Sequence, residues 1–96
     1  MMKKLTIVRF KPKPEHFDAF VQELKQASTA PDRTAILNSF VMTKDDEVFS
    51  IVIRHADKLE EDVKLGVQTL DGMRHMLQEY NEVDRHTIPL TGDLVE

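Results

Sequence analysis

Three short segments of the chain place apolar side chains at both odd and even positions. They are Leu5 to Phe10, Ile36 to Met42 and Val48 to Ile53. Because side chains alternate between the two faces of a β-strand, each segment predicts a strand that is apolar on both faces. One face collects Leu5, Ile7, Ile36, Phe40, Phe49, Ile51 and Ile53, and the other collects Val8, Phe10, Leu37, Val41, Val48 and Val52. We therefore expect a sheet that needs cover on both sides.

Two stretches have the periodicity of amphipathic helices. The first runs from Glu15 to Ala27, after Pro14, which suits a first helical position. The second follows Asp57, a candidate capping residue. Its apolar stripe is Leu59, Val63, Val67, Leu70, Met73, Leu77 and Tyr80. Because glycine is a poor helix former, we expect a kink or a break near Gly66.

The remaining elements complete a recognisable order. Lys44 to Glu47 is a polar loop that predicts a hairpin between the second and third strands. A last strand is expected at about Val83 to Leu90, at an edge where Pro89 need not donate an N–H group. Residues 91–93 predict a turn, and residues 94–95 an apolar tail that adds to a partner. The order β-α-β-β-α-β is that of a ferredoxin-like α+β sandwich with an antiparallel sheet.

The two helices are too few to cover both faces of this sheet. Four strands spaced by about 4.8 Å make a sheet roughly 19 Å wide, and two helices of about 10 Å diameter cover that width once. We expect the second face to pack on another copy of the chain, giving a dimeric α/β barrel. The 96 residues are expected to form one domain, residues 1–96.

Composition narrows the possible partners. The net charge is −4, and five of the 13 basic residues lie within the first 14 positions, which argues against a nucleic-acid surface. The chain has no cysteine, so thiolate chemistry and disulfides are excluded. The first apolar run ends at Arg9, too early for a signal peptide or a membrane span. We expect a cytoplasmic protein without a membrane partner.

The opening segment TIVRFKPKPEHFDAFVQELK, the closing segment TGDLVE and the element order together resemble the antibiotic biosynthesis monooxygenase-like proteins of the dimeric α+β barrel superfamily. The resemblance spans nearly the whole chain. It implies a pocket between each protomer's sheet and its helices, and an activity such as cofactor-independent oxygenation or isomerisation. Haem degradation is not implied, because this chain has no Trp and no Asn in its first strand.

Two residues are predicted to be catalytic. Cofactor-independent oxygenation needs a base or hydrogen-bond donor in a pocket that excludes water. His86, expected on the same strand face as Ile88 and Leu90, can supply either at neutral pH, or it is a half-exposed histidine on an edge strand. Asn38 interrupts the apolar row that includes Phe40, where it can orient a ligand carbonyl or bond to neighbouring backbone.

A second group of residues is predicted to bind the substrate. Arg9 can bind an acidic group or extend into solvent. Ser50 and Arg54 share the less bulky strand face, expected at the dimer interface or barrel lumen, where an interfacial ion pair is the alternative for Arg54. His75 can close a pocket beside flexible methionines, or belong to the core. The predicted substrate-binding residues are Arg9, Phe40, Ser50, Arg54, His75 and Met76.

Metal binding is not expected. Asp84 with His86, and His55 with Asp57, each give two candidate ligands two positions apart. A third convergent ligand is missing from the sequence pattern.

Together these features predict a cofactor-independent monooxygenase or isomerase that acts on a small aromatic or quinol-like compound. The alternative is a non-catalytic homodimer of the same fold that binds a small ligand or has a regulatory role. RNA binding is set aside, because the strand from Val48 to Ile53 lacks the aromatic-rich signature for stacking bases. The expected partners are a second copy of the chain and a small apolar or aromatic molecule.

Overall fold

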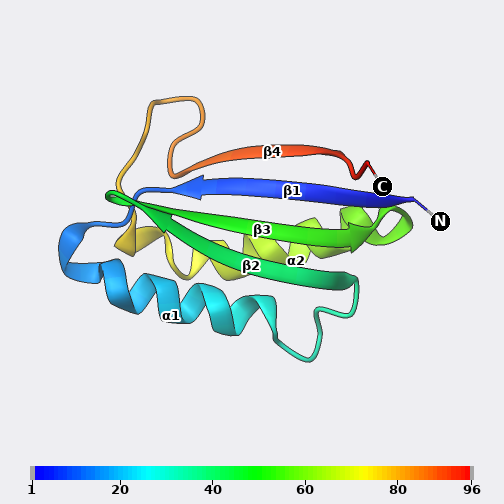
Figure 1. The fold of residues 1–96 in the computed structure, drawn as a ribbon. Coiled ribbons are helices and arrows are strands. Elements are labelled where there is room, and N and C mark those ends of the chain that lie inside the picture. Colours follow the sequence, from blue (N-terminus) through cyan, green and yellow to red (C-terminus); the bar gives the residue numbers. More distant parts are fainter. Residues whose placement is uncertain (1, 96) are drawn as a thin grey trace.

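The computed structural model describes residues 2–95, and four antiparallel strands form one sheet in the order β2-β3-β1-β4. The strands are β1 (Lys3–Phe10), β2 (Ile36–Lys44), β3 (Glu47–His55) and β4 (Thr87–Asp93). The helices are α1 (Phe17–Ser28) and α2 (Leu59–Asp71), with short 3-10 turns at η1 (Pro14–His16), η2 (Ala56–Lys58) and η3 (Arg74–Met76). Both helices lie on one face of the sheet (Figure 1). The predicted ferredoxin-like α+β architecture is confirmed.

Because side chains alternate along each strand, every second residue faces the helices. Along β3, Val48, Ser50, Val52 and Arg54 are buried, whereas the residues between them are partly exposed. The core between the sheet and the helices is built from Phe10, Phe20, Leu24, Val48, Met73, Met76 and Leu77. The rings of Phe10 and Phe20 pack at a tilt, with centroids 5.0 Å apart.

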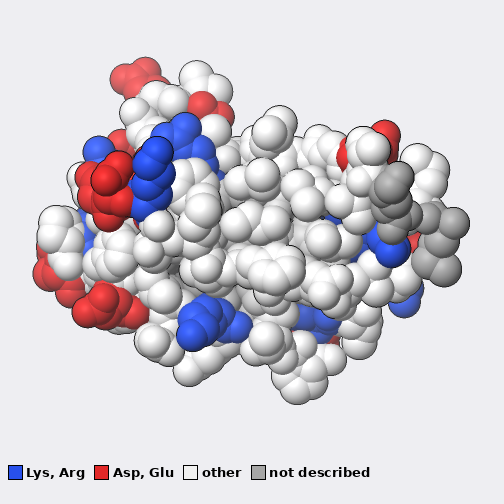
Figure 2. Space-filling model, viewed as in Figure 1, with Lys and Arg blue, Asp and Glu red and all other residues white. Residues whose placement is uncertain are grey.

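Within residues 2–95 no helix covers the opposite face of the sheet, as predicted (Figure 1). The strand register collects on this open face the apolar side chains of Leu5, Ile7, Phe40, Met42, Phe49, Ile51, Ile53, Ile88 and Leu90. Figure 2 views the molecule from the same side and shows the middle of this face free of charged side chains, which gather toward its ends. Phe40 and Leu90 are 56% and 70% exposed. The isolated protomer therefore presents a broad apolar surface.

A β-bulge places one residue on the other face from that predicted. Ile36 pairs with Arg54 and Asn38 pairs with Ile53, so the register shifts between Ile36 and Asn38. The extra residue reverses the alternation at this point. Ile36 therefore lies toward the helices, whereas Asn38 and Phe40 stay in one row on the open face.

The last strand begins later and ends later than predicted. Asn81 Oδ1 accepts backbone hydrogen bonds from Val83 (2.9 Å) and Asp84 (2.6 Å), and Arg85 has a positive φ of 58°. These local bonds hold residues 82–86 in a turn, because an Asn side chain competes with strand pairing for backbone N–H groups. The predicted turn at residues 91–93 is instead paired with β1.

The second helix also differs from the prediction in its ends and its buried face. It continues without a break through Gly66 to Asp71, and Asp57 lies in η2 without capping α2. Val63 and Val67 are 42% and 45% exposed, whereas an acidic residue of α2, Asp62, is 1% exposed. Asp62 is buried because it forms ion pairs with Arg33 and Arg54.

Candidate functional site

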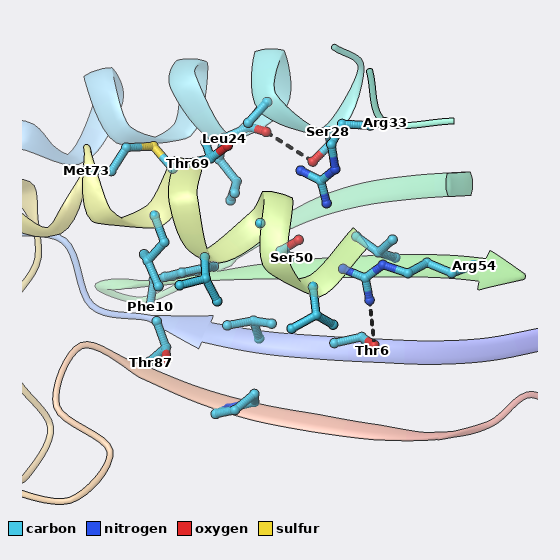
Figure 3. A pocket seen from close by; sticks show the side chains of 18 of the residues that line it. Thr6, Phe10, Leu24, Ser28, Arg33, Ser50, Arg54, Thr69, Met73 and Thr87 are labelled. Carbon is cyan, nitrogen blue, oxygen red and sulfur yellow. Dashed lines mark hydrogen bonds between the residues drawn. The ribbon is translucent and has the colours of Figure 1, made fainter. Parts of the chain in front are cut away.

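A cavity of about 270 Å³ lies between the sheet and the two helices (Figure 3). Its floor is made of β1 and β3 side chains, and its roof of residues from α1 and α2. The lining includes Thr6, Val8, Phe10, Leu24, Ser50, Val52, Leu70 and Met73. The volume is close to the lower end of the ~300–1,000 Å³ typical of small-molecule pockets. The cavity therefore suits a small, mainly apolar ligand.

The cavity opens between α2 and β4. Val63 and Val67 of α2 and Pro89 and Thr91 of β4 all line it and are all exposed to solvent. This explains why two valines of the apolar stripe of α2 are half-exposed: they form the rim of the cavity rather than part of its closed core.

A buried polar cluster forms one end of the cavity. Asp62 accepts hydrogen bonds from Arg33 Nε (2.7 Å) and Arg33 Nη2 (2.8 Å), and from Arg54 Nε. Arg54 Nη1 also donates to Thr6 Oγ1 (2.9 Å). Thr6 Oγ1 lies 2.9 Å from Thr91 Oγ1, so the network crosses from α2 to the edge strand β4. We name Arg33, Asp62 and Arg54 the arginine-aspartate cluster.

The cluster keeps Asp62 ionised. Burial by itself raises the pKa of a carboxyl group, but the hydrogen bonds and positive charges of Arg33 and Arg54 outweigh it, and the pKa of Asp62 is lowered. An acidic residue is therefore compatible with the buried face of α2, because both of its oxygens are paired.

Ser50 and Arg54 lie on the helix-covered face, and both line the cavity. Their expected position at a dimer interface or barrel lumen is therefore wrong, although the prediction that they share a strand face is confirmed. The ion pair expected for Arg54 is formed within the protomer, with Asp62. Of the predicted substrate-binding residues, only these two line the cavity between the sheet and the helices.

Arg9 lies on the open face with Asn38 and Phe40, on the side of the sheet opposite the cavity. Arg9 Nη2 donates to both oxygens of Glu47 (2.9 and 3.1 Å). Tyr80 donates its hydroxyl to the same carboxylate (2.6 Å). The hydrogen bond from Tyr80 and the charge of Arg9 lower the pKa of Glu47 despite its partial burial, while burial and Glu47 raise the pKa of Tyr80. Arg9 is thus engaged by an internal partner.

His86 lies in the turn before β4 and does not line the cavity. Its Nδ1 is 3.3 Å from Arg74 Nη1, so an N–H of Arg74 meets the unprotonated Nδ1 of a neutral imidazole. Burial, with the positive charges around it, lowers the pKa of His86 against the opposing effect of Glu79. The expected position of His86 in the middle of a strand is wrong, and its catalytic role remains a prediction.

His75 and Met76 lie in η3, beyond the end of α2. Met76 is buried in the core, and the ring of His75 meets the ring of His16 edge-on at a centroid distance of 6.0 Å. Neither residue lines the cavity. Across residues 2–95, no three His, Asp or Glu side chains come together as a metal-binding group.

Sequence reasoning missed Arg33, Asp62 and Thr6. Arg33 lies in a loop, where periodicity carries no information, and Asp62 looks like one of several acids in the first turn of α2. No local sequence signal marks their partnership, because Arg33 and Asp62 lie 29 positions apart.

No family model matches the chain, and no curated protein matches its sequence. Solved structures match its fold. A protein assigned as an antibiotic biosynthesis monooxygenase from Chloroflexus aurantiacus has a TM-score of 0.74 and 11% identity, covering 98% of this chain and 94% of the other. A dimeric ferredoxin-like protein from an uncultured marine organism has a TM-score of 0.69 and 6% identity, covering 100% and 90%.

SnoaB, a cofactor-independent oxygenase from Streptomyces nogalater, has a TM-score of 0.58 and 10% identity to this chain, covering 98% of it and 92% of SnoaB. At these identities the likeness is one of fold. The fold expected from the resemblance to antibiotic biosynthesis monooxygenase-like proteins is confirmed. Within residues 2–95, no helix is long and apolar enough to cross a membrane.

Proposed function

We propose that this protein is a cytoplasmic enzyme that oxygenates or isomerises a small aromatic, quinol-like compound without a cofactor, in the cavity between its sheet and helices. The observation that carries the proposal is the cavity itself, whose walls are mainly apolar and whose charged side chains lie at one end. The fold likeness to a cofactor-independent oxygenase supports the reaction class by analogy.

The proposed oxygenation proceeds through the substrate anion. A phenol that loses its proton delivers electrons to O₂, and a new carbon–oxygen bond forms at a ring carbon. That carbon then loses its hydrogen as a proton, the O–O bond breaks, and one oxygen leaves as water while the other remains as a carbonyl. The balance is phenol plus O₂ giving quinone plus water, so O₂ accepts all four electrons and no further reductant is needed.

The protein's part in this reaction is to favour the anion and to exclude water. The apolar walls around Phe10, Val52 and Met73 keep bulk water from the bound substrate. The net positive charge of the arginine-aspartate cluster stabilises a developing phenolate or enolate.

The second candidate function is that of a non-catalytic, ligand-binding or regulatory homodimer. A specific observation favours it. Among residues 2–95, those that line the cavity include no His, Cys, Asp, Glu, Lys or Tyr, and arginine does not act as a base because it stays protonated. In this alternative the same cavity holds a ligand without changing it.

Oxygen consumption with a panel of phenols and quinols, together with mass spectrometry of the products, separates the two candidates. If the cavity is the active site, Gly66→Leu removes turnover by filling it, while Gly72→Leu, outside the cavity, retains turnover. Saturable stabilisation by a compound that is never converted would support the binding protein instead. The same assay with His86→Ala and Asn38→Ala tests their predicted catalytic roles.

We also propose that two protomers pair through the open sheet face. The apolar side chains on this face and the charge-free middle of the surface support this pairing (Figure 2). One of the similar structures is itself a dimeric ferredoxin-like protein.

A further inference from the structure

We infer that the molecule bound in the cavity is an organic anion, with an apolar body and one negatively charged oxygen group that binds between Arg33 and Arg54. The inference deepens the proposed function and rests on it, because it names the class of molecule taken by the same site. It follows from the charge, the unused donors and the geometry of the arginine-aspartate cluster.

The arginine-aspartate cluster has a net charge of +1. Two arginines face a single carboxylate, and the side chains of Arg33, Arg54 and Asp62 are only 8%, 7% and 1% exposed. The other side chains that line the cavity are all uncharged. A net charge held this far from water is costly unless a counter-charge joins it. An anion in the cavity supplies that counter-charge.

The two arginines also hold unused hydrogen-bond donors. A guanidinium group carries five N–H bonds, and Asp62 and Thr6 accept from only two nitrogens of each arginine. Among residues 2–95, Arg33 Nη1 and Arg54 Nη2 have no hydrogen-bond partner. Figure 3 shows both guanidinium groups reaching the same end of the cavity. They can therefore donate to one anionic oxygen group.

Asp62 fixes this arrangement before any ligand arrives. Its two oxygens already accept three N–H bonds, so both arginine side chains are held in place. Donors held in this way need little rearrangement to meet an anion. Ser50, whose hydroxyl makes no hydrogen bond within the described chain, lines the cavity nearby and offers one further polar contact.

The body of the ligand is apolar. Beyond the cluster, the cavity continues between Val8, Phe10, Val52, Leu70 and Met73. A small inorganic anion would fill only the charged end and leave this apolar volume empty. An aromatic acid or a phenolate satisfies both parts of the cavity.

The test compares two probes of equal shape that differ in charge. Binding of 2-naphthoate, which is ionised at pH 7, and of the neutral 2-naphthamide is measured by isothermal titration calorimetry at low salt. We expect the wild-type protein to bind 2-naphthoate at least about tenfold more tightly, because hydrogen bonds to a charged group are worth more than neutral ones.

Three variants test whether the arginine-aspartate cluster causes the preference for 2-naphthoate. Arg33→Met leaves Asp62 and Arg54 as a neutral pair, and we expect it to lose the preference for 2-naphthoate while still binding the amide. Lys64→Met removes the same charge from an exposed position of α2 and should keep the preference. Asp62→Asn keeps both cations, so we expect it to retain the preference for 2-naphthoate over the amide.

Equal binding of the two probes to the wild type, or no binding of either at millimolar concentration, would overturn the inference. So would an equal loss of 2-naphthoate binding in Arg33→Met and Asp62→Asn, because that result would mean a purely structural cluster. The assay is independent of turnover. A clear preference for 2-naphthoate without oxidation of any phenol would leave the inference standing and refute the proposed oxygenase.

Discussion

Asp62 is the residue that holds the cluster together. Replacing it by Asn leaves the buried charges of Arg33 and Arg54 facing each other, and breaking a buried ion pair costs about 3–5 kcal/mol. We therefore expect Asp62→Asn to lower the free energy of unfolding by about that amount at pH 7, as measured by urea denaturation. A loss below about 1 kcal/mol, the upper limit for an exposed ion pair, would contradict the buried cluster.

The same variant should respond less to acid than the wild type does. The pKa of Asp62 is lowered in the folded protein, so its contribution is fully present above the unfolded pKa of about 3.9 and is lost as pH falls through the lower folded pKa. The stability difference between Asp62→Asn and the wild type should therefore shrink below about pH 4. A constant difference down to pH 3 would mean that Asp62 does not titrate as described.

His86 gives a second pH dependence, at a milder pH. Burial and the charges of Arg74, Arg85 and Lys13 lower its pKa in the folded protein, against the effect of Glu79. Because the unfolded chain then binds the proton first, near pH 6.5, the wild type loses stability as pH falls below that value. We expect His86→Gln to lack this component in thermal unfolding curves recorded between pH 8 and pH 5.5. Parallel curves for the two proteins would contradict the shift.

At the scale of elements, α2 is less stable than its length suggests because it contains a glycine in its interior. Gly66 does not have a positive φ, and a Cβ there would meet only Arg33 Nη2, at an ordinary 3.6 Å. Gly66→Ala should therefore raise the free energy of unfolding by about 0.5–1 kcal/mol. Gly72→Ala, at the end of the helix, is the matched control and should gain less. A loss of stability in Gly66→Ala would mean that Arg33 cannot accommodate the methyl group.

Prediction from the sequence succeeded where an apolar pattern defined a strand or helix. It failed where a side chain formed a hydrogen bond or ion pair that the pattern does not show. Apolar residues on both strand faces predicted three strands, and helical periodicity predicted α1. The last strand was displaced because Asn81 bonds to nearby backbone, an interaction that periodicity does not register.

For the candidate site, too, the sequence predicted some residues and missed others. Strand alternation places Ser50 and Arg54 on one face, so these cavity residues could be found from the sequence. The partnership of Arg33 with Asp62 joins residues 29 positions apart, and nothing in the local pattern distinguishes Asp62 from the other acids at the start of α2. A long-range ion pair of this kind requires the fold.

At the scale of the whole molecule, the protomer has one covered and one uncovered sheet face, and the proposed dimer covers the second. In a symmetric interface each substitution appears twice, so a Lys introduced into the open face places two charges in an apolar contact. We expect native mass spectrometry to find a wild-type dimer and to find that Leu90→Lys, at a position 70% exposed in the protomer, is at least about a hundredfold weaker in association. Val83→Lys changes an apolar residue that is 90% exposed but lies in the loop before β4, and it should remain dimeric. A monomeric wild type, or equal weakening by both variants, would show that the open face is not where the protomers meet.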